Sequence, residues 1–153
     1  MLKSKNQTMR SKFVSLKFLF PCAAALAFAL AAQAEGKKTK VDTSKLPPAS
    51  AKAGVTYAND IKPIFEKSCV KCHGAEKPKA KLRLDSLEGA LKGGADGKVI
   101  ESGKSADSVL LHNVARLGEE DYWMPPPDNK AKIPPLTTEE IGLIRAWIDQ
   151  GAK

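Results

Sequence analysis

The chain of 153 residues is poor in the side chains that build metal sites and disulfide frameworks, with three cysteines, two histidines and three methionines. It has no second C-x-x-C pair and no H-x3-5-H pair, so a structural zinc site lacks candidates for its four ligands. No segment alternates between apolar and polar residues over the length of a strand, and no internal repeat is present. These absences predict an all-α domain with long loops.

Acidic residues are missing from residues 1–17, which hold five basic side chains. An apolar run and then Ala32-Gln33-Ala34 follow, and this order is typical of a secretory signal peptide. We expect residues 1–34 to be removed after Ala34, taking Cys22 along, and the protein to be periplasmic or otherwise exported. An uncleaved membrane anchor is the alternative, because Phe13 to Ala32 could span a bilayer. No other membrane segment is expected.

The mature charge balance is modest, because removing the signal segment lowers the formal net charge from +8 to +3. No dense basic stripe with interleaved aromatic residues remains, which excludes nucleic acid as a partner. Residues 35–54 are rich in lysine, serine and proline and predict a flexible linker. Residues 55–153 then form one domain of about 100 residues, a size at which a buried prosthetic group would help the core.

Helical periodicity and capping patterns place the elements of this domain. Between Pro125 and Pro135, five prolines in eleven residues predict a stiff extended loop. The first expected helix runs from near Asp60 to Ser68. The second is marked by Leu84, Leu87 and Leu91, with Asp85 and Glu88 as a capping box and Gly93-Gly94 at its end. A third helix is capped by Ser105, and a fourth is capped by Thr137 and Glu140 and ends at Gly151.

The stretch KSCVKCHGAEKP, residues 67–78, concentrates the chemistry of the chain in Cys69, Cys72 and His73. A redox dithiol, a zinc site and a covalently attached haem all use such residues. A redox dithiol normally opens a helix in a βαβ unit, whereas this pair closes a helix. Haem accounts for all three residues, since two thiols form thioethers with the vinyl groups and the histidine binds the iron. The pattern therefore favours covalent haem.

Counting the methionines and histidines of the mature chain narrows the candidates for the second iron ligand. After signal removal Met124 is the only methionine, and His112 is the only histidine besides His73. Met124 lies in YWMPPP, where the prolines fix the backbone, while His112 lies within a predicted helix. A His/Met pair is the ligation of electron-transfer cytochromes c. Met124 is favoured, with His112 or an open iron as alternatives.

The order of CVKCHG, LRLDSLEGALKGGADGK, YWMPPP and EEIGLIRAWIDQGA resembles the planctomycete-type cytochrome c domain over residues 57–152. The resemblance implies a class I-like cytochrome c fold of about four helices with long loops around one haem c, attached to Cys69 and Cys72 and ligated by His73 and Met124. Candidates for hydrogen bonds to the haem propionates are Tyr122, Trp123, Arg83 and Arg116. The Pro78 carbonyl is a candidate partner for the His73 ring.

These features predict a monohaem electron carrier rather than an enzyme, acting between redox partner proteins as a monomer or as a subunit of a complex. The alternatives are a peroxidase-like haem enzyme or gas sensor with a labile distal ligand, and a haem docking module of a larger exported oxidoreductase complex. Residues 62–83 carry a net charge of +5. An acidic partner is therefore expected to dock near Lys67, Lys71, Lys77 and Lys79. The acidic residues around Met124 would form the opposite pole of the molecule, and they are Glu119, Glu120, Asp121 and Asp128.

Overall fold

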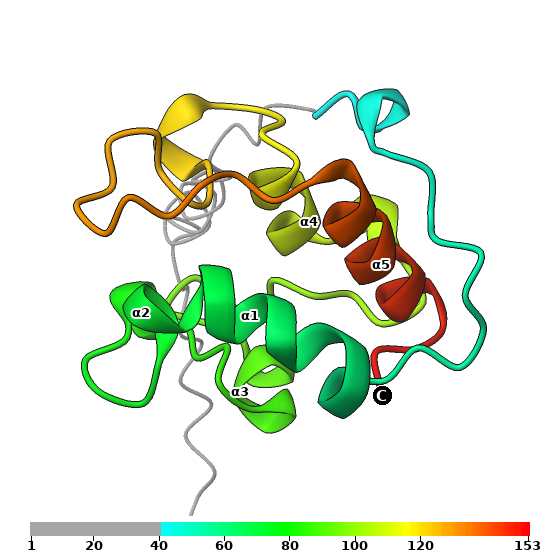
Figure 1. The fold of residues 1–153 in the computed structure, drawn as a ribbon, viewed down its shortest axis with the longest axis horizontal. Coiled ribbons are helices and arrows are strands. Elements are labelled where there is room, and N and C mark those ends of the chain that lie inside the picture. The colour runs from blue at the N-terminus through cyan, green and yellow to red at the C-terminus, as the bar shows by residue number, and fades with distance from the viewer. Residues whose placement is uncertain (1–40) are drawn as a thin grey trace, which may run out of the picture. The chain divides into compact units, whose positions relative to one another are not determined.

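The computed structural model describes residues 41–153, so the predicted signal peptide and residues 35–40 of the predicted linker lie outside it (Figure 1). The helices are α1 (Lys62–Ser68), α2 (Val70–His73), α3 (Leu87–Lys92), α4 (Val109–Val114) and α5 (Thr138–Asp149). Short turns complete the order: η1 (Thr43–Lys45), η2 (Tyr57–Ile61), η3 (Lys79–Lys81), η4 (Ser105–Asp107) and η5 (Glu120–Tyr122). Residues 41–153 contain no strand beyond one isolated bridge between Gly94 and Gly97, which confirms the all-α class. None of the described helices is long and apolar enough to cross a bilayer.

The centre of the core is an aromatic contact between the first and last helices. Phe65 of α1 and Trp147 of α5 are fully buried and meet edge to face, with ring centroids 6.3 Å apart. The ring of Tyr57 lies 6.2 Å from Phe65 and 6.0 Å from Trp147. Such pairs add stability beyond the apolar area that they bury. The predicted start of helix near Asp60 is confirmed in substance, because η2 leads directly into α1 with Pro63 in the first turn.

Helix α5 follows its sequence pattern closely. Thr137 accepts a hydrogen bond from the backbone of Glu140, and the Glu140 side chain accepts one from the backbone of Thr137, which completes the predicted capping box. One face of the helix is buried against the core, and Gly151 follows with a positive φ of 99°. The backbone amide of Tyr57 donates to the carbonyl of Lys153, so the C-terminus is fixed beside the start of η2.

The prediction of a flexible linker over residues 35–54 is wrong for residues 41–54, which pack along α5 (Figure 1). Leu46 is buried, and the Arg145 guanidinium donates to the Pro47 carbonyl at 2.6 Å. The backbone amide of Ser50 donates to the Gly142 carbonyl at 2.9 Å. A Cβ at Gly142 would lie 2.7 Å from the Pro48 carbonyl oxygen, so glycine permits this close approach.

Two predicted caps are also wrong. Helix α3 begins after Ser86, whose side chain accepts from the Gly89 amide, while Asp85 forms an ion pair with Arg83 instead. The predicted end of this helix at Gly93 is confirmed, and Gly93 has a φ of 84°. Ser105 lies in η4, and α4 begins after Ser108. At α3 the neighbouring serine takes the capping role while Asp85 is paired with Arg83. At α4 the Ser108 side chain makes no cap bond, because its hydroxyl accepts from the Glu101 amide and donates to the Lys104 carbonyl.

Candidate functional site

A cleft with about 390 Å³ of empty space, open solvent included, lies between the α1–α2 turn, α4 and the proline-rich loop. The lining is mainly apolar, and the structure places all four predicted site residues in it. The lining residues are Ser68, Cys69, Cys72, His73, Leu84, Leu110, Val114, Met124, Pro125, Pro126, Asn129 and Ile133.

The turn between α1 and α2 brings the two thiols and the imidazole to one cleft. Cys69 leaves helical geometry with φ −125°, which ends α1 and starts α2. Its carbonyl accepts from the backbone amides of Cys72 at 3.0 Å and His73 at 2.9 Å. The sequence predicted the cysteines at the end of a helix. The structure adds a second short helix, α2, which carries Cys72 and His73.

A backbone carbonyl fixes the orientation of the His73 ring. Its Nδ1 lies 3.2 Å from the Leu82 carbonyl oxygen, so Leu82 takes the role that the sequence suggested for Pro78. When Nδ1 donates this hydrogen bond, Nε2 carries the lone pair that metal ligation needs. Burial lowers the pKa of His73 below its ordinary value, and the hydrogen bond to Leu82 partly offsets this effect. Burial therefore favours the neutral imidazole, and the hydrogen bond to Leu82 orients the ring before any iron binds.

The segment that packs behind His73 is hydrogen-bonded to the core. The backbone amide of Leu84 donates to the His73 carbonyl at 2.8 Å, and the Tyr57 hydroxyl donates to the Leu84 carbonyl at 3.1 Å. Tyr57 belongs to the aromatic cluster with Phe65 and Trp147. Two hydrogen bonds therefore connect the backbone of His73 to the centre of the fold.

The burial and pKa of the thiols help to distinguish a redox dithiol from the other candidate uses of the C-x-x-C-H motif. Cys69 and Cys72 are free thiols, and Cys69 is buried. Burial raises the pKa of the Cys69 thiol to about 12. Redox dithiols have the opposite property, a lowered thiol pKa that makes the thiolate available. The environment of Cys69 therefore disfavours a thioredoxin-like role.

Met124 enters the cleft from the opposite side, on the loop that follows η5. Its side chain is partly buried against the core, and its backbone amide donates to the Asn113 carbonyl at 3.1 Å. The alternative ligand His112 does not line the cleft, because its Nε2 lies 2.7 Å from the Ala106 carbonyl oxygen. Of the two candidates for a second ligand, the structure brings Met124 alone to the cleft that holds His73.

The sequence analysis missed Asn129, which closes the loop around Met124. Its side-chain amide donates to the carbonyls of Pro126 at 2.8 Å and Ile133 at 2.9 Å, and its Oδ1 accepts from the Ile133 amide at 2.8 Å. Asn129, Pro126 and Ile133 all line the cleft. The Pro-Asp-Asn triplet was the available signal, since asparagine often bonds to its own local backbone in turns.

Two buried donors beside this loop lack acceptors. The Arg116 guanidinium lies over the Trp123 ring, 5.5 Å from its centroid. Within the part of the chain that the structure describes, Arg116 Nε and Trp123 Nε1 are buried without a hydrogen bond. Buried donors without partners are costly, so they fit a site for an anionic group such as a haem carboxylate. The other propionate candidates fit less well, because Arg83 is paired with Asp85 and Tyr122 is 63% exposed.

Comparison with known families agrees with this arrangement. Residues 69–128 match the family model described as Planctomycete cytochrome C. The matched segment starts at Cys69 and extends beyond Met124, so it includes all four predicted site residues. Searches among curated proteins and solved structures gave no significant match. The family match confirms the resemblance to a planctomycete-type cytochrome c domain, and such a domain implies haem.

Proposed function

We propose that this protein is an exported monohaem c-type cytochrome that carries electrons between redox partner proteins. The observation that carries the proposal is the cleft, in which Cys69, Cys72, His73 and Met124 converge from two sides. When bound, a haem c supplies an iron that gains or loses one electron. The roles of the four residues follow from their chemistry and from their places in the cleft.

On the side of α2, Cys69 and Cys72 would hold the group covalently, and His73 would present Nε2 to the iron. The carbonyl of Leu82 fixes the ring orientation and the tautomer through Nδ1. Because the thioethers and the ligand lie within five residues, their relative positions depend on a single turn of backbone. Attachment of this kind suits a small domain, since the group cannot leave the core.

On the side of the proline-rich loop, Met124 would supply the second ligand. The loop also excludes water from the cleft through Pro125, which is buried, and through Pro126 and Ile133. Arg116 and Trp123, whose buried donors lack partners among the described residues, would donate hydrogen bonds to the carboxylates. Met ligation together with an apolar surround favours the reduced state and so raises the reduction potential.

The composition of the cleft supports a carrier over a peroxidase-like enzyme. The titratable side chains in its lining are Cys69, Cys72 and His73, and the proposal assigns all three to the cofactor. Enzymes that activate a bound ligand need a positioned acid or base near it. His112, the one further histidine of the chain, is bonded to the Ala106 carbonyl away from the cleft.

The test is expression of the full chain in a bacterium that exports and attaches haem, followed by mass and absorption measurements. We expect a mature chain that starts at Glu35, one covalent haem and a ferric spectrum with the methionine-to-iron charge-transfer band. Cys69→Ala with Cys72→Ala should abolish covalent haem and yield a poorly folded chain, because the core loses its central apolar body.

Three outcomes would contradict parts of this proposal. A compact, protease-resistant double variant without haem would show that the cofactor is not needed for the fold. A high-spin ferric spectrum with rapid cyanide binding would favour the enzyme or gas sensor. A mature chain that retains residues 1–34 would replace cleavage with membrane anchoring.

A further inference from the structure

Residues 41–54, which we call the strap, contact three parts of the fold before the chain enters η2 (Figure 1). At the start of the strap, Val41 Cγ2 lies 3.4 Å from the position that a Cβ on Gly118 would occupy. The middle of the strap is hydrogen-bonded to α5. Near its end, Lys52 forms an ion pair with Asp60 of η2. The strap therefore joins the turn after α4 to α5 and to η2.

The strap is held mainly through its backbone. The Arg145 guanidinium donates to the carbonyls of Leu46 and Pro47. Gln150 Nε2 donates to the Lys52 carbonyl at 2.8 Å. Leu46 is the one buried residue of the strap. Segments with few buried apolar contacts open at a lower free energy than the core, so we expect the strap to open before the rest of the domain unfolds.

The turn that the strap contacts also supports Met124. This turn, residues 115–118, follows directly after α4. The Asn113 carbonyl accepts from the backbone amides of Arg116 at 3.2 Å and Met124 at 3.1 Å. The Arg116 guanidinium in turn lies over the Trp123 ring. One shared acceptor and one ring contact therefore connect the turn to the backbone on both sides of the Trp123–Met124 bond.

We propose that the strap is a latch on the distal side of the cleft, the side that carries Met124. Docked on α5, the strap supports turn 115–118 and keeps the Met124 loop closed. Its release lowers the free energy at which that loop opens. The inference rests on the proposed function, because it concerns access to the second ligand position of the iron. It gives a role to residues that precede the family match, which starts at Cys69.

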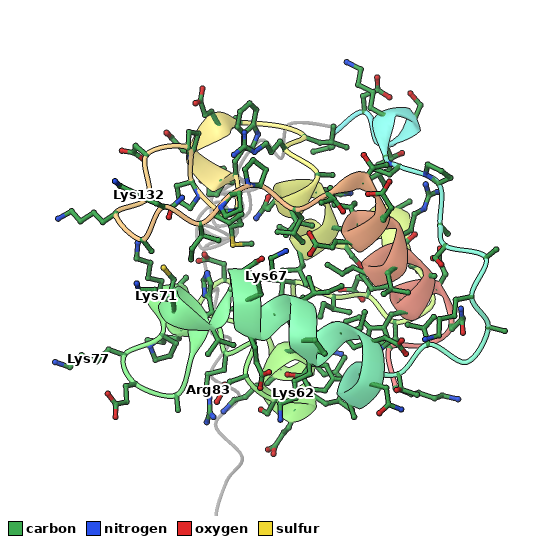
Figure 2. The ribbon with its side chains drawn as sticks, viewed as in Figure 1. Lys62, Lys67, Lys71, Lys77, Arg83 and Lys132 are labelled. Carbon is green, nitrogen blue, oxygen red and sulfur yellow. The ribbon has the colours of Figure 1, made fainter. Side chains whose placement is uncertain are left out.

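The test is limited trypsin digestion of the ferric holoprotein, combined with imidazole titration of the same samples. Cleavage after Lys45 and Lys52 reports opening of the strap, in which both residues lie. Cleavage after Lys132 reports opening of the Met124 loop, from which this lysine projects (Figure 2). The rate of cleavage follows the population of the open form when opening and closing are fast. The three readouts measure the strap, the loop and the iron separately.

Gly142→Ala breaks the closest contact between the strap and α5. A Cβ at this position would lie 2.7 Å from the Pro48 carbonyl oxygen, so the strap has to shift. The same change raises the helix propensity of α5, which by itself would stabilise the domain. We expect cleavage after Lys45 and Lys52 to become at least about tenfold faster in spite of that gain.

Arg145→Met releases the strap without introducing a clash. It removes the guanidinium that donates to the Pro47 carbonyl at 2.6 Å. Loss of a charged hydrogen bond shifts an equilibrium by at least about tenfold, so strap cleavage should accelerate by that factor. If half of this free energy reaches the loop, cleavage after Lys132 should become at least about threefold faster, and imidazole should bind at least about threefold more tightly.

The matched control is Thr138→Ala, at an exposed position in the first turn of α5. This change also raises the helix propensity of α5, and among the described residues Thr138 makes no hydrogen bond to the strap. We expect all three readouts to match those of the wild type. Acceleration of strap cleavage in this control equal to that in Gly142→Ala would overturn the latch, because a general effect on α5 would then explain the result.

Three further results would count against the proposal. Faster cleavage of the strap with unchanged cleavage after Lys132 and unchanged imidazole affinity would make the strap an independent segment, while leaving the carrier function in place. Unchanged strap cleavage in both Gly142→Ala and Arg145→Met would show that these contacts do not hold the strap. A preparation without haem would overturn the proposed function itself, and with it the control of iron ligation by the strap.

Discussion

The two sides of the cleft are built in different ways. The α2 side places His73 on backbone that is bonded to the core through Leu84 and Tyr57. The opposite side places Met124 on a loop that is closed by its own members, through Asn129. On the first side the hydrogen bonds lead on to Tyr57, which packs against Trp147 of α5, whereas the bonds that close the second side join residues of the same loop. The loop is joined to α4 through the hydrogen bond from Met124 to Asn113.

This difference assigns separate tasks to the two sides. Tertiary packing over-determines the position of His73, so changes near it should affect the stability of the whole domain. Local hydrogen bonds hold the loop of Met124, and such segments open at a lower free energy than the core. The strength of distal ligation is therefore expected to depend on the loop, while the fold is expected to depend on the α2 side.

The largest effect on the cofactor site is expected from Met124→Ala. Loss of the thioether should remove the methionine-to-iron band and open the iron to added imidazole or cyanide. The reduction potential should fall by at least about 60 mV, which corresponds to a tenfold change for a one-electron couple. Redox titration and ferric absorption spectra measure both changes.

His112→Ala is the control for this variant, since His112 bonds to Ala106 outside the cleft. It should leave the spectrum and the potential unchanged. If His112→Ala removed the distal ligand and Met124→Ala did not, the assignment of the two sides would have to be reversed.

Much of the site was predictable because its signals are local. The cysteine and histidine spacing lies within one turn, and the capping box of α5 requires only Thr137 and Glu140. Met124 could be predicted from the scarcity of methionine and from the prolines beside it. Each of these patterns is short enough that the surrounding fold does not change its meaning.

The rest depended on contacts between distant residues. Residues 41–54 have the composition of a linker, but Gly142 and Arg145 of α5 create a surface on which their backbone binds. The Leu82 carbonyl reaches His73 because η3 turns the chain back, and sequence spacing alone suggested Pro78. Charge counting along the chain similarly grouped Lys67 with the cleft, although Glu140 pairs with it.

A smaller effect, confined to the loop, is expected from Asn129→Ala. This change removes three side-chain hydrogen bonds, each with a net contribution of roughly 0.5–1.5 kcal/mol. If about half of the total free energy of these bonds favours loop opening in the variant, imidazole should bind the ferric protein roughly 4- to 40-fold more tightly. Equilibrium titration of the ferric spectrum measures the apparent affinity.

The matched control is Asn59→Ala, which changes an exposed asparagine of η2, an element that does not line the cleft. It should leave imidazole affinity unchanged. An unaltered affinity in Asn129→Ala would mean that the prolines alone hold Met124, and the contrast between the two sides would lose its local basis.

The smallest effect is expected from Tyr57→Phe, and it should appear in stability alone. The hydroxyl of Tyr57 donates to the buried Leu84 carbonyl, and burial raises the pKa of Tyr57 to about 12, so the phenol remains a donor at neutral pH. Its removal should cost about 1 kcal/mol, or roughly 5 °C in Tm for a domain of this size. Tyr122→Phe, at a side chain that is 63% exposed, should leave Tm unchanged. Thermal unfolding of the ferric holoproteins measures both variants, and imidazole titration should show no change in either. A Tyr57→Phe protein with normal Tm but altered imidazole affinity would place control of the distal ligand on the α2 side, against the division of tasks argued above.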